Sequence, residues 1–93
     1  MREIDTTGQY RRDLAREATG QHGKTLKNDL KDVLKLLQND TQLPRSYKDH
    51  QMQGEQKHLR NCHLHGDLVL LYCKIGKDTL QLVRLGSHSA LGI

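Results

Sequence analysis

The run Leu68–Ile75, LVLLYCKI, constrains the fold of this chain more than any other segment. Every residue except Lys74 is apolar, so the run is apolar at both odd and even positions. Because successive side chains of a strand point to opposite faces, such a run is buried on both faces. It therefore predicts a central strand of a sheet.

Weaker patterns predict further strands around this run. Lys57–Leu64 is a modest strand candidate, and His65–Gly66 would supply the hairpin turn that joins it to the central strand. After a second turn at Gly76–Asp78, the segment Thr79–Leu85 alternates as a strand does. The opening residues 2–7, REIDTT, could form a short first strand.

The first half of the chain has helical periodicity instead. Tyr10, Leu14 and Ala18 recur at helical spacing, and Thr6 or Thr7 could cap this helix. A second helix is predicted over residues 24–40, with Thr25 as its cap. Its apolar stripe is Leu26, Leu30, Val33, Leu34 and Leu37. The predicted class is α+β in the order β-α-α-β-β-β, with the helical hairpin packed on one face of an antiparallel sheet.

Length and composition bound the remaining possibilities. Ninety-three residues suffice for one small domain, which we expect to span residues 1–93. No apolar run approaches the ~20 residues that cross a bilayer, and MREIDTTGQY lacks a signal-peptide core, so we expect a cytoplasmic protein. Cys62 and Cys73 are expected to be reduced thiols.

The positive charge gathers in the second half of the chain. The net charge is +4, of which residues 1–40 carry +1 and residues 41–93 carry +3. Five of the six histidines also lie in this second part. This asymmetry favours a polyanionic partner, although a basic surface without function fits the charge too.

Four histidines lie between Tyr47 and Asp67, and three explanations of this cluster are open. The first is a metal site, but Cys62 and His63 would alternate faces on a strand, and no Cys-x-x-Cys pair supports a second half-site. We therefore expect neither a metal nor a cofactor. The second is acid–base chemistry on RNA, and the third is a set of ordinary surface residues.

Acid–base cleavage of RNA needs a base for the 2′-hydroxyl proton, an acid for the leaving 5′-oxygen, and cations that stabilise the phosphorane. His50 and His88 lie at two points that a hairpin fold could bring together. His63 would lie opposite Asp67 across the hairpin, so that the carboxylate could orient the imidazole. Two arginines on predicted strands are available for phosphate, Arg60 and Arg84.

Widely separated motifs give a more specific indication. They are Gly8-Gln9-Tyr10, Tyr47-Lys48-Asp49-His50, Gln53-Gly54, Lys57, Arg60, His63, Asp67, Leu70-Leu71-Tyr72 and the closing segment from Arg84 to Gly92, RLGSHSALG. Together they resemble the signature of YafQ-type toxins in the RelE/ParE toxin–antitoxin superfamily, and the resemblance covers essentially the whole chain.

The resemblance implies a metal-independent endoribonuclease that cuts mRNA in the ribosomal A site and is neutralised by a cognate antitoxin, in a complex expected to be a heterotetramer. It implies His50, His63, Asp67 and His88 as catalytic residues. The expected RNA- or phosphate-binding residues are Arg60, Arg84, Lys57 and Lys48. As a hypothesis for roles, His50 and His88 form the base–acid pair, while His63, paired with Asp67, binds the scissile phosphate or shares proton transfer.

This chain departs from the family pattern at a few positions, and two alternative functions also stay open. Gln56 and Leu68 stand where the family commonly has aromatic residues, and the tail lacks a Phe. Since aromatic rings stack on splayed bases, these departures bear on nucleotide preference and affinity. The alternatives are a toxin of the same fold that binds a protein such as DNA gyrase, and a nucleic-acid-binding module without catalysis. Neither needs several catalytic histidines.

Overall fold

One sheet of five strands organises the molecule, and β4 lies at its centre. The computed structural model describes residues 1–93. The strands are β1 (Glu3–Thr6), β2 (His50–Gln51), β3 (Arg60–His65), β4 (Leu68–Ile75) and β5 (Thr79–Ser87). They lie in the order β1-β5-β4-β3-β2, with β1 parallel to β5 and all other neighbours antiparallel. Residues 68–72 of β4 are almost completely buried, so the predicted central strand is confirmed.

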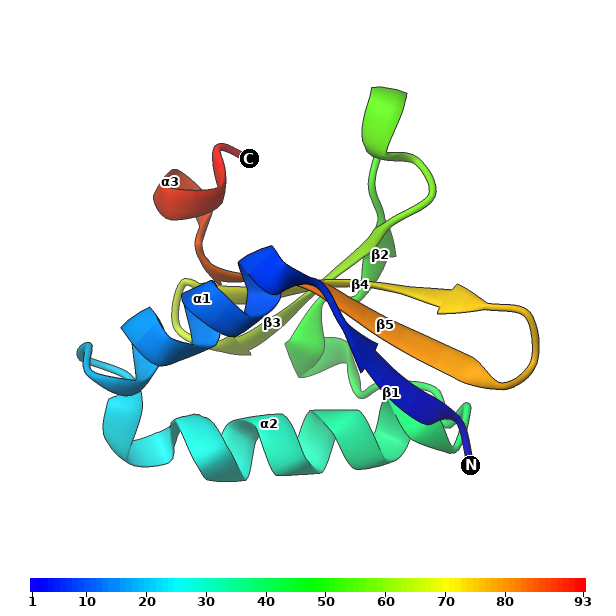
Figure 1. The fold of residues 1–93 in the computed structure, drawn as a ribbon, viewed down its shortest axis with the longest axis horizontal. Helices are drawn as coiled ribbons and strands as arrows, with labels where there is room; N and C mark the ends of the chain where they lie inside the picture. Colours follow the sequence, from blue (N-terminus) through cyan, green and yellow to red (C-terminus); the bar gives the residue numbers. More distant parts are fainter.

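The helices divide between the two faces of the sheet. They are α1 (Gly8–Ala18), α2 (Gly23–Gln38) and the short α3 (His88–Leu91), with single 3₁₀ turns η1 (Arg45–Tyr47) and η2 (Gly54–Gln56). Figure 1 shows α2 beneath the sheet, whereas α3 and the loop that carries η2 rise above it. The predicted α+β class with a helical hairpin on one face is confirmed.

The main core lies between the helical hairpin and the sheet. The α2 stripe contributes Leu26, Leu30, Val33 and Leu37, all buried, while Leu34 lies at the margin. These side chains pack with Tyr10 of α1 and with alternate residues of the strands, namely Cys62, Leu68, Leu70, Tyr72, Leu80, Leu82 and Leu85. The apolar residues that recur at helical spacing and those that alternate along the strands therefore pack together in one layer.

The opposite face of the sheet carries a second, much smaller core. Leu59, Val69 and Leu71 are buried there, and partly buried side chains from the neighbouring segments pack against them: Met52, Cys73, Val83 and Leu91. The loop between β2 and β3 and the C-terminal α3 supply this cover. Because the cover is thin, polar side chains at its edge remain open to solvent.

Both cysteines are free. Cys62 on β3 is fully buried in the main core, and Cys73 on β4 is partly buried. Burial raises the pKa of the Cys62 thiol to about 12, so this sulfur stays protonated at neutral pH.

The helix starts differ in part from the predicted ones. Thr7 caps α1 as predicted, with its Oγ1 accepting the Tyr10 N–H at 3.0 Å. Thr25 does not cap α2, which begins two residues earlier at Gly23. The chain turns so tightly after α1 that a Cβ at position 23 would lie 2.3 Å from the Ala18 carbonyl oxygen. Only glycine fits this turn, and the helix begins there.

The sequence patterns did not predict the short elements β2 and α3. The strand β2 has two polar residues, and α3 spans a single turn, so neither has a periodic pattern of its own. Ser87 stabilises α3, because its hydroxyl accepts the Ala90 N–H at 3.1 Å. The observed β3 is Arg60–His65 rather than Lys57–Leu64, because η2 and its following turn occupy the residues before Arg60.

A buried carboxylate joins α1 to β5. Asp13 is completely buried and accepts hydrogen bonds from Arg84 Nε at 2.7 Å and from the Leu85 N–H at 3.0 Å. Arg16 Nη1 lies 3.2 Å from the same carboxylate. Burial alone would raise the pKa of Asp13, but the hydrogen bonds from Arg84 and Leu85 outweigh it and hold the pKa below its usual value.

We expect Asp13→Asn to lower the free energy of unfolding by roughly 2–4 kcal/mol at pH 7, because Arg84 loses its buried partner. A carboxylate with a lowered pKa stabilises the fold above the unfolded-state pKa, and this stabilisation is lost as the pH falls through the folded-state pKa. The difference from the native chain should therefore shrink below about pH 4. Urea unfolding at several pH values measures it. Asp78→Asn, at an exposed turn, is the control, and equal effects of the two substitutions would contradict the prediction.

Candidate functional site

His63 and His88 meet on the thinly covered face of the sheet. His63 follows Cys62 on β3, and since Cys62 faces the helices, His63 faces the opposite side. His88 begins α3 directly after β5. Their imidazole rings have centroids 4.9 Å apart, although 25 positions separate them in the chain. Two strands that flank β4 thus bring two of the predicted histidines into contact.

His50 joins the same face from the edge strand. It lies directly opposite Asn61 on β3, two residues before His63, so His50 and His63 point to the same side. The His50 Nδ1 lies 2.7 Å from the Lys48 carbonyl oxygen. A carbonyl only accepts, so Nδ1 carries a proton, and Nε2 of the neutral ring carries the lone pair.

The three imidazoles form one electrostatic cluster. Partial burial lowers the pKa of His63 below its usual value, and the positive charges of His88, Lys48 and His50 lower it further. His63 is therefore mostly neutral at pH 7. The ring can donate and accept hydrogen bonds without adding a further positive charge.

Asp67 does not lie opposite His63, contrary to the expected register. The hairpin turn is Gly66–Asp67, one residue later than predicted, and His63 pairs with Val69. The Asp67 carboxylate lies 3.3 Å from Nε2 of His22, at the start of α2. The predicted orientation of His63 by Asp67 is therefore wrong in this structure. The reason is the two-residue turn together with a register shift between His63 and His65, which sequence alone does not set.

The two predicted arginines are both held by carboxylates. Arg60 is three residues before His63 and directly opposite Tyr72, whose ring lies in the main core, so Arg60 points to the other side of the sheet. It donates through Nε and Nη2 to Asp49, at 3.2 and 3.1 Å. Arg84 is bound to Asp13.

The two predicted lysines lie in different places, and the buried Asn61 was not predicted. Lys48 lies beside the histidines, in the left-handed conformation with φ of 50°. Lys57 is exposed at the end of η2, in the loop that stands away from the sheet. Asn61 is almost fully buried opposite His50, and its Oδ1 has no hydrogen-bond partner. An asparagine in a short polar stretch gives no signal in the sequence, so we did not predict it.

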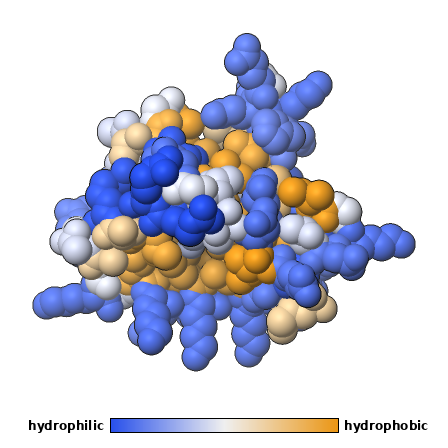
Figure 2. Space-filling model, viewed as in Figure 1, coloured by the Kyte–Doolittle hydropathy of each residue, from blue (hydrophilic) through white to orange (hydrophobic).

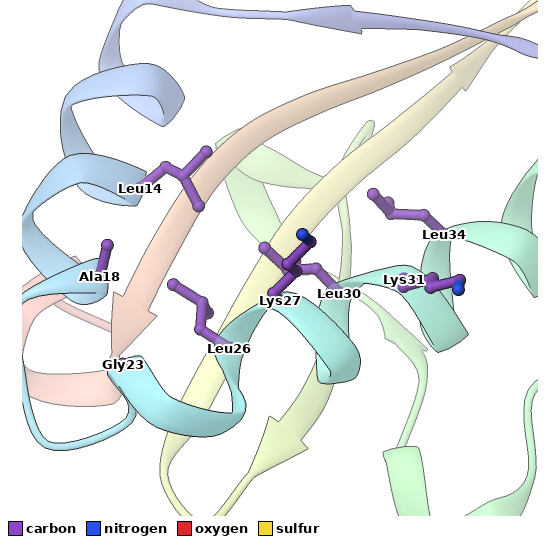
Figure 3. Close-up of a pocket in the computed structure, with 8 residues that line it drawn as sticks. All are labelled: Leu14, Ala18, Gly23, Leu26, Lys27, Leu30, Lys31 and Leu34. Carbon is purple, nitrogen blue, oxygen red and sulfur yellow. The ribbon is translucent and has the colours of Figure 1, made fainter.

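Two hollows of the molecule have no histidine in their lining. A groove of about 420 Å³ runs between α1 and α2 and is lined mostly by apolar side chains, with Lys27 and Lys31 among them (Figure 3). Figure 2 shows it as an apolar band between the hydrophilic surface over α1 and the hydrophilic side chains that project from α2. The second hollow, of about 370 Å³, includes Arg45, Lys48 and Arg60.

No group of three or more His, Cys, Asp or Glu side chains is arranged so that it could hold a metal ion. The His63–His88 contact and the His22–Asp67 pair each bring together two such side chains. The helices are also too short or too polar to cross a bilayer.

Comparison with known proteins extends the description from the site to the whole chain. A family described as the YafQ bacterial toxin of type II toxin–antitoxin systems matches residues 2–92. The mRNA interferase toxin YafQ of Escherichia coli K12 is 40% identical over 92 residues, which span 98% of this chain and 96% of that protein.

Solved structures agree with this match. The crystal structure of the Escherichia coli DinJ–YafQ complex has a TM-score of 0.76 at 35% identity and covers 98% of both chains. A metal-bound toxin from Helicobacter pylori has a TM-score of 0.80 at 37% identity, over 98% of this chain and 99% of that one. The chain therefore belongs to the YafQ family of bacterial toxins from type II toxin–antitoxin systems.

Proposed function

We propose that this chain is an endoribonuclease that cuts mRNA in the ribosomal A site, in the bacterial cytoplasm, by histidine acid–base chemistry. The observation that carries the proposal is the gathering of His50, His63 and His88 on one thinly covered face of the sheet. Membership of a family whose relative is named an mRNA interferase supports the reaction type.

The proposed reaction is an attack of the 2′-oxygen on the adjacent phosphorus. His50 Nε2, which carries the lone pair when the ring is neutral, takes the 2′-hydroxyl proton. The bond from phosphorus to the 5′-oxygen breaks, and His88 gives its proton to that oxygen. The products are a 2′,3′-cyclic phosphate and a free 5′-hydroxyl. No step needs a metal ion.

His63 is proposed to bind the scissile phosphate. Its lowered pKa keeps the His63 ring mostly neutral, and the ring N–H can donate a hydrogen bond to a phosphate oxygen. Asp67 joins the proposed site because its neighbour Leu68 pairs with Ser87, so it lies at the end of the sheet where His88 begins α3. Its carboxylate lies 3.3 Å from Nε2 of His22 and is more than half exposed, so the proposed role of Asp67 is a contact with the substrate.

Replacement of the histidines tests the proposed chemistry. We expect His50→Ala and His88→Ala each to lower the single-turnover cleavage rate on programmed ribosomes by about 10²–10⁴-fold, because each removes one proton transfer. His63→Ala should lower it less. His58→Ala, on the exposed η2 loop, is the control and should keep the native rate. Near-native rates for all three variants would favour a protein-binding toxin or a non-catalytic nucleic-acid-binding module instead.

The nucleophile can be tested on the substrate side. A message with a 2′-deoxy nucleotide immediately before the cut should resist cleavage almost completely, since it lacks the attacking oxygen. The same substitution two nucleotides away should have little effect. Gel analysis of the labelled message measures both. Continued cutting at the modified position would point to a water nucleophile and would rule out the proposed mechanism.

We also propose that a cognate antitoxin neutralises this toxin in a complex of two toxin and two antitoxin chains. Solved relatives include the DinJ–YafQ toxin–antitoxin complex. The groove between α1 and α2 suits an amphipathic antitoxin segment, because its floor is apolar and Lys27 and Lys31 line it. Acidic side chains of the antitoxin would pair with these lysines.

A substitution within the groove tests this surface. Ala18→Glu places a larger, negative side chain among the lining residues, so we expect at least a tenfold loss of antitoxin affinity, about 1.4 kcal/mol. Ala15→Glu, exposed on the same helix but outside the groove, should bind normally. Calorimetric titration measures both, and ribosomal cleavage should be unchanged in both. Equal affinities of the two variants would place the antitoxin elsewhere.

A further inference from the structure

We propose that the hollow beside β2 is a second phosphate subsite, which holds a backbone phosphate of the RNA next to the one that is cut. This inference rests on the proposed ribonuclease function and adds a binding site to it. The hollow has a volume of about 370 Å³ and three cationic side chains in its wall, Arg45, Lys48 and Arg60. Asp49 is its only carboxylate.

The charges of the hollow leave it positive. The Asp49 carboxylate is already engaged, because Arg60 donates two hydrogen bonds to it and the Tyr72 hydroxyl donates a third. Arg45 and Lys48 are exposed and form neither an ion pair nor a side-chain hydrogen bond. Two cations without partners beside a third that is already paired with a carboxylate favour an anionic ligand.

Arg60 is held ready for such a ligand. Its Nε and Nη2 are bound by Asp49, which fixes the plane of the guanidinium, while Nη1 has no partner. The side chain is 42% exposed, so this nitrogen can donate to a phosphate oxygen. A fixed guanidinium loses little conformational entropy on binding. The Asp49 pair therefore positions Arg60 and leaves it a free donor.

The hollow adjoins the histidine face through Lys48. Lys48 lines the hollow, and its carbonyl accepts the His50 Nδ1 proton. It adopts a left-handed conformation that is rare for lysine and costs on the order of 1 kcal/mol, and such strain is often found at functional sites. One residue thus touches both places.

The two places lie on opposite sides of the sheet edge. On β3, His63 faces the thinly covered side and Arg60 points to the other side. The neighbouring two-residue β2 is the outermost strand of the sheet. An RNA strand cut at the histidines could pass around this short edge and place a neighbouring phosphate among the cations. Continuity with the histidine face favours RNA over an acidic protein segment as the occupant.

Arg45→Gln tests the subsite, with Lys77→Gln in the distant β4–β5 turn as a control that removes the same charge. The probe is a short RNA that carries a 2′-deoxy nucleotide at the cut, and fluorescence anisotropy measures its binding across KCl concentrations. We expect Arg45→Gln to bind ~10-fold more weakly and to reduce the slope of log K against log[KCl] by about 0.7. Lys77→Gln should change neither the affinity nor the slope.

The single-turnover cleavage rate of Arg45→Gln at saturating toxin should stay within ~2-fold of native, since phosphate contacts of this kind position the strand.

A neutral methylphosphonate at each flanking position in turn then locates the phosphate. At one position the methylphosphonate should weaken RNA binding by the native chain. At the same position it should not weaken RNA binding by the Arg45→Gln variant. Equal affinities and slopes for Arg45→Gln and Lys77→Gln, no position that couples to Arg45, or no binding of the probe at low salt would each overturn the inference. Weaker antitoxin binding with unchanged RNA binding would overturn it too, in favour of an acidic peptide. A further outcome separates the two proposals. If the histidine variants keep native cleavage rates while one methylphosphonate position depends on Arg45, the phosphate subsite is supported and the proposed histidine chemistry is wrong.

Discussion

Burial of β4 on both of its faces is the constraint on which the rest of this structure depends. Residues 68–72 are almost fully buried, so both sides of the sheet need apolar cover. Each buried leucine contributes roughly 1.5–3 kcal/mol, which makes the cover energetically necessary in so small a domain. The helical hairpin provides most of it on one side. On the other side only the β2–β3 loop and α3 are available, and they bury three residues.

This unequal cover explains where chemistry can occur. The helical side is filled by a continuous core, whereas the thin side leaves polar side chains at the rim of a small apolar floor. His63 reaches that rim from β3 and His88 from the end of β5, on either side of β4. Their proximity has an electrostatic consequence, since His88, Lys48 and His50 all help to lower the pKa of His63. A neutral imidazole beside others that can carry the proton is a suitable arrangement for acid–base catalysis.

Two carboxylates hold the two predicted arginines. Asp13 holds Arg84 at the junction of α1 and β5, and Asp49 holds Arg60 behind the edge strand. The sequence offered both arginines as partners of the scissile phosphate, because each lies on a predicted strand near a predicted catalytic residue. Their hydrogen-bond partners are acidic residues 71 and 11 positions away, which no local pattern reveals. The same applies to Asp67, whose partner His22 comes from the start of α2.

The sequence by itself determined the class of fold, the central strand, the α2 stripe and the Thr7 cap, because each depends on local periodicity or on hydrogen bonds within a few residues. It also determined the family, since motifs from Gly8 to Gly92 keep both spacing and residue type, and the family matches residues 2–92. The tertiary structure alone decided the hairpin register, the pairing of Asp67 with His22, the side of the sheet that Arg60 faces, and the meeting of His63 with His88. A one-residue change of register reverses the face of every side chain, and such a change is controlled by turn geometry and distant packing.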